Sequence, residues 1–405
     1  MGLSAIKNKL KKNRKLYLII SPVFGMYRNS LMRMARLTRG IDGNKAVFCA
    51  FDSRSYNDNP RYISEELHRL RPETEIVWLF RDVKEAKAKY DIPDYVKCYN
   101  PIEKDGVREM ATAKVLVDNF NKRSYLKFRF PQQVYVQTWH GDRAFKKVGY
   151  DNPGQYTYLI EEKCALCVCG SDYGERQYRS AFRYKGEVMK KGYPRNDILV
   201  RNDPEEEIAL RKKMGLDLNT KYLIFAPTFR DVASKDHLAQ RMPIDLKRVL
   251  ATLERTTGET WKCLVRTHYM SYGLSMDDTS EKFIPMTDYP EMAELLRVSD
   301  AMITDYSSCA GDYALMRRPI WLYQDDIADY TGNNRGLYFN MEDSPYWVAS
   351  TPEELDRLIE ATTPEKAEKN CDDILEFYGT NETGQSARLV AEYIVSKLDP
   401  VRKSV

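Results

Sequence analysis

Short apolar runs alternate with longer amphipathic segments along almost the whole chain, and this alternation constrains the fold more than any other feature. Runs rich in branched and aromatic side chains are typical of buried strands, and the segments between them have the spacing of helices. Strand–helix alternation predicts an α/β fold of parallel sheets with helices on both faces. We expect strands at residues 46–51, 76–80, 115–117, 134–138, 166–169, 222–226, 262–266, 301–304 and 320–323, and helices at 62–70, 205–213 and 292–298.

The length of 405 residues exceeds the size at which one hydrophobic core stops growing, so we expect two domains. A highly charged stretch after residue 200 marks the boundary between them. Two sheets of this kind imply a cleft with ligands at the carboxyl ends of the strands. We place one Rossmann-like domain at 41–200 and another at 201–380, preceded by a basic segment at 1–40 and followed by a helix at 381–405 that packs back on the first domain.

The first forty residues contain ten Lys or Arg residues and no Asp or Glu. Apolar residues recur at helical spacing, and the apolar run 16–20 is broken by Ser21 and Pro22, far short of the roughly 20 residues that span a membrane. A signal peptide is not indicated, because a small-residue cleavage site is missing. The pattern favours peripheral contact with an anionic membrane surface over a solvated tail or a nucleic-acid-binding arm.

The eight cysteines are scattered and indicate a reducing compartment rather than a disulfide framework. Cys164, Cys167 and Cys169 lie close together in the sequence, but they fall on an alternating strand and have no fourth ligand nearby. Structural zinc is therefore disfavoured. We predict that the chain binds no metal.

Chemistry-bearing residues cluster where the strand at 134–138 ends. His140 can accept a proton from a hydroxyl near neutral pH, and Gly141 allows close approach of a ligand to the backbone. Arg143, Lys146 and Lys147 follow and can neutralise a phosphate. The alternative is a surface histidine beside a solvated basic turn.

Three further polar clusters follow strands of the second domain, at 227–231, 266–268 and 305–308. Ser307 and Ser308 would cap a helix, where free amides and hydroxyls favour a diphosphate, although a plain serine cap has the same pattern. His268 and Arg266 could hold phosphoryl oxygens opposite His140. A Walker loop, a Gly-rich dinucleotide fingerprint and a paired Asp cluster are absent from the sequence, which favours a metal-independent mechanism without a cofactor.

These motifs resemble the CDP-glycerol glycerophosphotransferase family, whose members build the polyol-phosphate backbones of teichoic acids and some capsules. The resemblance covers residues 130–340, about half the chain, and implies a GT-B architecture with the donor held by the C-terminal domain. It rests on the segments 139–149, 192–197, 226–231, 266–268, 304–308 with Asp312, and 335–336.

The resemblance also implies roles for individual residues. His140 resembles the base that activates the acceptor hydroxyl, and His268 is implied to stabilise the developing charge. Asp142 and Arg143 replace a small residue and a proline of the family, a departure that we expect to bear on the acceptor. Substrate-binding roles are implied for Trp139, Gly141, Asp142, Arg143, Arg195, Pro227, Thr228, Arg230, Arg266, Thr267, Ser307, Ser308 and Asp312.

The implied reaction transfers glycerol phosphate, or a related polyol phosphate, from CDP-glycerol or CDP-ribitol to a hydroxyl of an undecaprenyl-linked or polyol-phosphate acceptor and releases CMP. The reaction would take place at the cytoplasmic face of the membrane. No nucleic-acid partner is expected, and the sequence does not decide whether the chain forms a homo-oligomer. Two alternatives are a GT-B glycosyltransferase with a nucleotide-sugar donor and a non-catalytic membrane-bound assembly protein. The lack of a large additional domain slightly favours addition of one or a few units.

Overall fold

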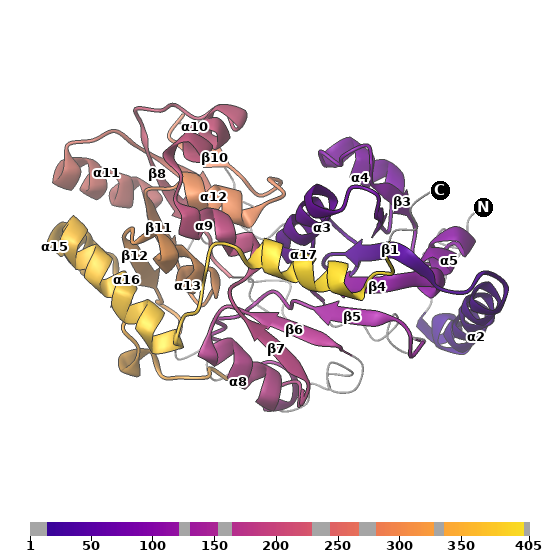
Figure 1. Ribbon diagram of the computed structural model, residues 1–405. Helices are drawn as coiled ribbons and strands as arrows, with labels where there is room; N and C mark the ends of the chain where they lie inside the picture. Colours follow the sequence, from indigo (N-terminus) through magenta and orange to yellow (C-terminus); the bar gives the residue numbers. More distant parts are fainter. Residues whose placement is uncertain are drawn as a thin grey trace.

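The computed structural model describes residues 14–120, 130–152, 164–228, 244–266, 281–327 and 336–400, and it contains two parallel sheets side by side (Figure 1). The sheet of the N-terminal half has the order β3-β2-β1-β4-β5-β6-β7, and that of the C-terminal half has the order β10-β9-β8-β11-β12-β13. The strands are β1 (Asp42–Cys49), β2 (Glu75–Leu79), β3 (Lys97–Tyr99), β4 (Ala113–Asp118), β5 (Val134–Gln137), β6 (Leu166–Cys169), β7 (Glu187–Lys190), β8 (Lys221–Phe225), β9 (Trp261–Val265), β10 (Phe283–Pro285), β11 (Ala301–Thr304), β12 (Ile320–Tyr323) and β13 (Val348–Ala349).

Helices cover both faces of each sheet, and several begin at sequence-encoded caps. Thr351 and Thr363 each accept a hydrogen bond from a backbone N–H in the first turn, and a proline follows each threonine as the first helical residue. The helices are α2 (Arg14–Arg39), α3 (Asp58–Leu70), α4 (Val83–Lys89), α5 (Lys104–Thr112), α8 (Asp172–Ser180), α9 (Asp197–Arg201), α10 (Pro204–Lys213), α11 (Leu246–Thr257), α12 (Met292–Val298), α13 (Cys309–Tyr313), α15 (Pro352–Ala361), α16 (Pro364–Tyr378) and α17 (Ser386–Lys397).

The central strands are buried on both faces, because their side chains alternate between two cores. In the N-terminal sheet, Val47 and Val77 pack with α2 and α5 on one face. Phe48 and Trp78 point to the other face, where they pack with α3 and α17. The C-terminal sheet is likewise enclosed, with α11 and α15 on one face and α12, α13 and α16 on the other. Two-sided burial explains the nearly continuous apolar runs of the sequence.

Helix α17 comes from the end of the chain but packs on the first sheet (Figure 1). Val390, Ala391 and Ile394 are fully buried in the core that contains Trp78. The segment between α16 and α17 therefore crosses from the second half of the molecule to the first.

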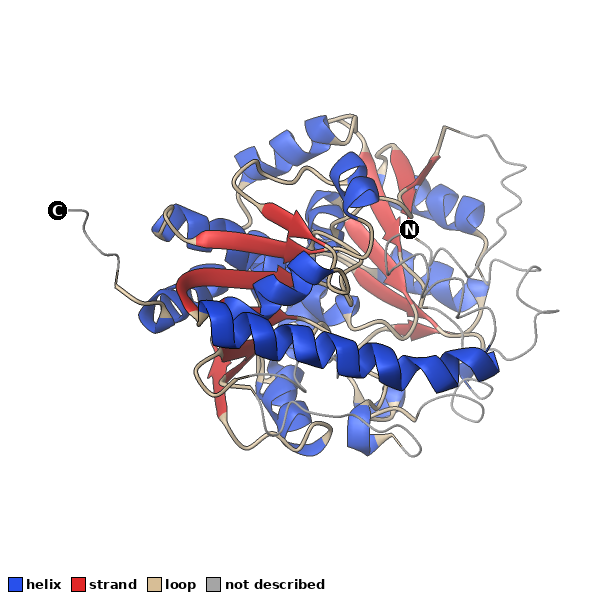
Figure 2. Cartoon of the chain, turned by 90° about the vertical axis from the view of Figure 1, so that its right-hand side faces the viewer, coloured by secondary structure: helices blue, strands red, loops and turns tan. Residues whose placement is uncertain are grey.

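Helix α2 lies along the side of the molecule that faces the viewer in Figure 2. Met32 and Ala35 are buried against the first domain, on the face shared with α5. The helix runs through Ser21 and Pro22, the pair at which the apolar run of the sequence breaks. Among the described residues, no helix combines the length and apolar character needed to cross a bilayer.

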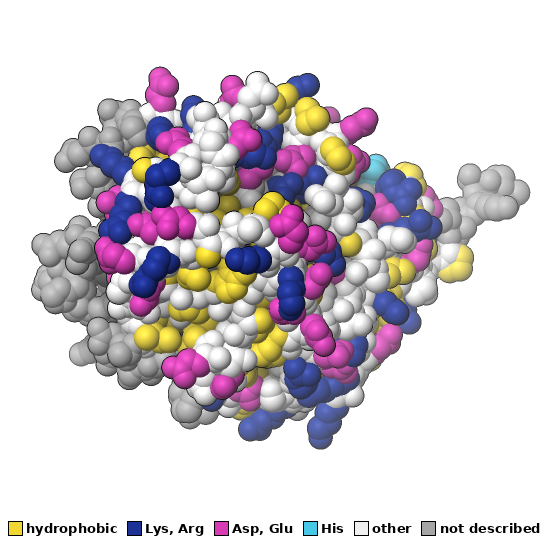
Figure 3. Space-filling model, turned by 90° about the vertical axis from the view of Figure 1, so that its left-hand side faces the viewer, with side chains coloured by type: hydrophobic (Ala, Val, Ile, Leu, Met, Phe, Trp, Pro, Cys, Tyr) yellow, Lys and Arg dark blue, Asp and Glu magenta, His cyan; other side chains and the backbone are white. Residues whose placement is uncertain are grey.

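The outer face of the C-terminal half carries cations and anions side by side (Figure 3). Arg248 of α11, for example, pairs with Glu353 and Asp356 of α15 at 2.8 and 2.7 Å. Neither sign of charge predominates on this face, in contrast to the basic N-terminal segment.

Every strand expected from the sequence coincides with a strand of the structure, within a few residues at the ends. Four strands were not predicted from the sequence, namely β3, β7, β10 and β13, and these are the edge strands of the two sheets. Their side chains are mostly exposed or half-buried, so they lack the apolar run that identifies a central strand.

Candidate functional site

The loop that carries His140 starts with a strained turn at the end of β5. Trp139 has a φ of 54°, in the left-handed region that side chains rarely adopt. The turn is held by Gln137, whose Oε1 accepts a hydrogen bond of 2.7 Å from the Trp139 N–H. Backbone strain of this kind persists where the surrounding structure enforces it, and it concentrates at functional sites.

One imidazole nitrogen of His140 is hydrogen-bonded to the backbone, and the other is able to accept a proton. Nδ1 lies 2.7 Å from the backbone oxygen of Asn119 at the end of β4. A carbonyl oxygen can only accept, so Nδ1 carries the proton and Nε2 is left with its lone pair. Among the described residues, no hydrogen-bond partner lies at Nε2. This is the arrangement that a general base requires.

Three aromatic rings surround the imidazole: Phe51 at 5.3 Å, Phe120 at 5.8 Å and Trp139 at 4.2 Å between ring centroids. The pKa of His140 is lowered chiefly by this burial, while the Asn119 carbonyl and the Asp58 carboxylate raise it and Arg195 lowers it. The net direction keeps the ring neutral, and so able to accept a proton, at pH 7.

The facing edge of the C-terminal sheet is organised around Asp305, which follows β11. Its Oδ1 accepts hydrogen bonds from the N–H groups of Thr228 (2.8 Å) and Tyr306 (2.5 Å). The Pro227–Thr228 segment after β8 is therefore tied to the segment after β11. Two polar strand ends predicted from the sequence are brought together in this way.

Ser307 and Ser308 are half-buried at this edge. Helix α13 begins at Cys309 with Ser308 as its N-cap, and the Ser307 hydroxyl accepts from the Cys309 N–H at 3.4 Å. The helix spans 5 residues, so its dipole is small and the hydroxyls and amides of the turn are the groups that can meet an anion.

The two edges approach each other at Gly141. A Cβ atom placed on Gly141 would lie 3.9 Å from Ser308 Oγ and 3.6 Å from Trp139 Nε1. The loop that carries the imidazole is therefore next to the serine turn of the other domain.

Asp142 and Arg143, which the resemblance implies for substrate binding, are enclosed in the protein. Their side chains are both 0% exposed. Asp142 Oδ1 accepts from the Gly170 N–H at 3.2 Å. Arg143 donates to Asp312 at 2.9 Å and to Glu382 at 3.1 Å. This placement favours a role in joining the domains over direct contact with a substrate.

Arg195 is the second arginine of this interdomain network. It pairs with Asp58 of α3 at 2.7 Å and with Asp312 of α13 at 2.8 Å, and it donates to the His140 carbonyl at 3.0 Å. Asp312 therefore binds both arginines, one with each carboxylate oxygen. Burial raises the pKa of Glu382, at the other end of the network, to about 7.

The remaining predicted residues divide into two groups. Arg266 lies at the end of β9, half-buried, and donates to the carbonyl oxygens of Met286 (2.8 Å) and Thr287. Arg230, Thr267 and His268 lie outside the described residues, as does Arg335.

Four polar residues of this region were not predicted from the sequence: Asp58, Asn119, Glu291 and Glu382. Asn119 directly follows the strand β4 and lies two residues after the apolar run 115–117, so the strand-end argument that singled out His140 could have found it. Glu291 accepts from the Asp58 N–H at 2.8 Å, a contact between domains that no sequence pattern marks.

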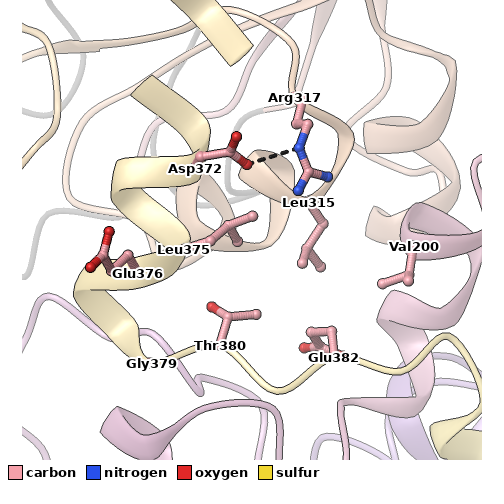
Figure 4. A pocket seen from close by; sticks show the side chains of 9 residues that line it. All are labelled: Val200, Leu315, Arg317, Asp372, Leu375, Glu376, Gly379, Thr380 and Glu382. Atoms are coloured by element: carbon pink, nitrogen blue, oxygen red, sulfur yellow. Dashed lines mark hydrogen bonds and ion pairs between the residues drawn. The ribbon is translucent and has the colours of Figure 1, made fainter. Parts of the chain in front are cut away.

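A separate cavity of about 520 Å³ lies against the segment that joins α16 to α17 (Figure 4). An ion pair of 2.8 Å between Arg317 and Asp372 lies at its wall. The cavity shares Glu382 with the interdomain network. Within the described part of the chain, no group of three or more His, Cys, Asp or Glu side chains could hold a metal ion.

The family model for CDP-glycerol:poly(glycerophosphate) glycerophosphotransferases matches residues 30–396. A teichoic acid poly(glycerol phosphate) polymerase of Bacillus spizizenii is 29% identical over 401 residues, which cover 93% of this chain and 99% of the relative. A teichoic acid ribitol-phosphate primase of the same organism is 23% identical over 94% of this chain and 97% of the relative.

A similar enzyme of Staphylococcus epidermidis, also a poly(glycerol phosphate) polymerase, is 28% identical, but the match spans only 50% of its length. A solved structure of the wall teichoic acid polymerase TagF has a TM-score of 0.78 and 26% identity, and the match covers 92% of this chain and 94% of that one. The expected α/β fold of two parallel sheets is thereby confirmed, and it is the fold of the TagF polymerase.

Proposed function

We propose a residue-level mechanism for this chain, which belongs to the CDP-glycerol:poly(glycerophosphate) glycerophosphotransferase family. The chain is a polyol-phosphate transferase of teichoic acid synthesis that uses CDP-glycerol or CDP-ribitol. In the proposed mechanism, the N-terminal sheet edge activates the acceptor and the C-terminal edge holds the donor.

The acceptor hydroxyl gives its proton to Nε2 of His140, and its oxygen attacks the β-phosphorus of the donor. The new O–P bond forms as the bond from the β-phosphorus to the bridging oxygen breaks, and CMP leaves with that oxygen. The proton then passes from the imidazolium to solvent. Nδ1, held by the Asn119 carbonyl, keeps the ring in the accepting tautomer.

On the donor side, Ser307, Ser308 and Thr228 supply hydroxyls and amides for the diphosphate, and Arg266 supplies positive charge. His268, Thr267 and Arg230 are assigned to the same side from the family resemblance. One observation carries the two-sided proposal: the approach of Gly141 to Ser308, which brings the base and the anion-binding turn together.

The choice of polyol and the product length are finer questions. We propose CDP-glycerol as the donor, in line with the name of the matching family. The lack of a large additional domain, which favours addition of one or a few units, does not distinguish the two products, because a polymerase and a primase are covered over 99% and 97% of their lengths. We propose a polymer product, since the polymerase is 29% identical to this chain and the primase 23%.

We also propose peripheral attachment to the cytoplasmic face of the membrane through α2. Its outward side exposes 61% of Val23, 68% of Met26 and 86% of Leu37. The exposed cations Arg33 and Arg39 lie on the same helix, and the basic residues of the segment 1–13 precede it. Apolar and cationic side chains together suit an anionic lipid surface.

The test is an assay of the purified chain with CDP-glycerol or CDP-ribitol and an undecaprenyl-linked acceptor, with CMP measured by chromatography and product length by mass spectrometry. His140→Ala should lower turnover at least 100-fold, the loss typical for a general base, while calorimetric binding of CDP-glycerol is retained. His68→Ala, in a histidine of α3 that stacks on Tyr95, is the matched control and should keep its turnover. Near-normal turnover of His140→Ala would exclude the assigned base.

A further inference from the structure

Asp58, the first residue of α3, is a buried acid that the mechanism has not yet used. Its side chain is 8% exposed, and its φ of 60° lies in the left-handed region, which Asp and Asn tolerate better than other side chains do. Both carboxylate oxygens are engaged. Oδ1 accepts from Asn119 Nδ2 at 2.9 Å and from the Asn59 N–H at 2.7 Å, and Oδ2 accepts from Arg195 at 2.7 Å.

All three partners of Asp58 also form hydrogen bonds with the loop that carries His140. The backbone oxygen of Asn119 accepts from His140 Nδ1 at 2.7 Å. Arg195 donates to the backbone oxygen of His140 at 3.0 Å. Asn59 Nδ2 donates to the backbone oxygen of Trp139 at 3.3 Å. One carboxylate therefore supports both the ring and the backbone of the histidine.

We propose that Asp58 is the positioning residue of His140: it holds Asn119, whose carbonyl fixes the Nδ1–H tautomer, and Arg195, which holds the histidine backbone. The proposal rests on the assignment of His140 as the base. A carboxylate is needed here, since a neutral amide could accept from Asn119 but would leave the buried Arg195 with Asp312 as its one carboxylate partner among the described residues.

The charge of Asp58 also acts on the imidazolium that forms when His140 takes a proton. Of the residues that the structure describes, Asp58 and Arg195 are the charged groups that act on the ring, and they oppose each other. Glu291 and Asp312 lie one contact further away, bound to Asp58 and Arg195 respectively. Removal of the Asp58 charge therefore leaves Arg195 dominant and lowers the pKa of His140 further.

The tautomer can be measured without any activity assay, because the chain has 4 histidines. In long-range ¹H–¹⁵N spectra of the full chain labelled at histidine, His140→Gln identifies the signals of His140. We expect the Nδ1–H tautomer in the wild type. In Asp58→Asn, which keeps size and tolerance of positive φ, we expect mixed tautomers and a titration midpoint lowered by about one pH unit. A wild-type Nε2–H tautomer, or an unchanged midpoint in Asp58→Asn, would overturn the proposal.

Kinetics give the second readout. Asp58→Asn should lower kcat roughly 10- to 100-fold, as loss of an outer support of a catalytic group does, and shift the rising limb of the pH–kcat profile to lower pH. Asp105→Asn, in an exposed acid of α5 that also pairs with an arginine, should change neither. A uniform loss at all pH values, with the limb in place, would indicate a merely structural role.

A second variant, Asn119→Ala, tests the proposal even if Asp58→Asn does not fold. Asn119→Ala removes the link to Asp58 but keeps the backbone carbonyl, so we expect a smaller change of tautomer in the same direction. If the wild type has the Nδ1–H tautomer while His140→Ala retains turnover, the positioning holds and the assignment of the base fails.

Discussion

His140 and Arg143 lie in one short loop, yet their surroundings are opposite. The imidazole is half-buried among aromatic rings with one nitrogen available, and the guanidinium is fully enclosed by Asp312 and Glu382. The first half of the loop therefore presents a reactive group, and the second half fastens the two domains together. Rigid attachment directly behind the base is what a site assembled from two domains requires.

Substitution of the enclosed arginine should have the largest effect. Arg143→Met leaves Asp312 and Glu382 buried without this cation, and we expect the free energy of unfolding to fall by about 3–5 kcal/mol. The measurement is denaturant unfolding. Arg248→Met also removes an arginine with two carboxylate partners, but its side chain is exposed to solvent, so its loss of stability should be much smaller than that of Arg143→Met. Equal losses of unfolding free energy in the two variants would show that the enclosed arginine contributes no more to stability than an exposed one.

The converse change concerns the reactive half of the loop. His140→Gln should lower turnover at least 100-fold, about 2.7 kcal/mol of activation free energy. Its free energy of unfolding should stay within about 1 kcal/mol of the wild type, because the side chain is half-buried and serves no ion pair. Joint measurement of kcat and unfolding distinguishes the two halves. A loss of stability as large as that of Arg143→Met would show that the histidine also fastens the domains.

Two glycines allow the same test, since Gly311 lies against Arg143 and Gly141 lies next to His140. A Cβ on Gly311 would lie 2.6 Å from Arg143 Cδ, so Gly311→Ala should cost about 1–3 kcal/mol of unfolding free energy. A Cβ on Gly141 meets nothing nearer than 3.6 Å, so Gly141→Ala should leave the unfolding free energy within about 0.5 kcal/mol. Thermal or denaturant unfolding of both variants measures the two losses. Equal losses of unfolding free energy would contradict the assignment of a reactive half and a structural half to the loop.

The last prediction concerns the pH dependence of stability at Asp118, the residue before Asn119. Burial raises the pKa of Asp118, directly before Asn119, to about 7. Between about pH 4 and pH 7 the folded chain thus binds a proton that the unfolded chain releases, so stability falls as pH rises through this window, by at most about 1.4 kcal/mol per pH unit. Unfolding of Asp118→Asn at pH 5 and pH 7 should show a flatter dependence. A slope identical to that of the wild type would place the titration elsewhere, for example at Glu291.

The sequence predicts what depends on local pattern and misses what depends on assembly. Central strands are apolar throughout and were found, whereas the edge strands β3, β7, β10 and β13 are half-exposed and were not. His140 and Ser308 are predicted as site residues because both follow such strands. The enclosure of Arg143 could not be predicted, since Glu382, one of its partners, comes from a segment 239 residues away. In the sequence alone, a cation beside a histidine has the same pattern whether it meets a phosphate or a buried carboxylate.

The return of α17 to the first domain has a consequence for synthesis on the ribosome. Val390, Ala391 and Ile394 complete the core that surrounds Trp78, and they are translated long after the strands they cover. Until α17 is made, one apolar face of the N-terminal sheet is only partly covered, chiefly by α3, while the C-terminal sheet has all its strands by residue 349. The order of completion is thus the reverse of the order of translation: the second domain can close first, and the domain that carries the base closes last.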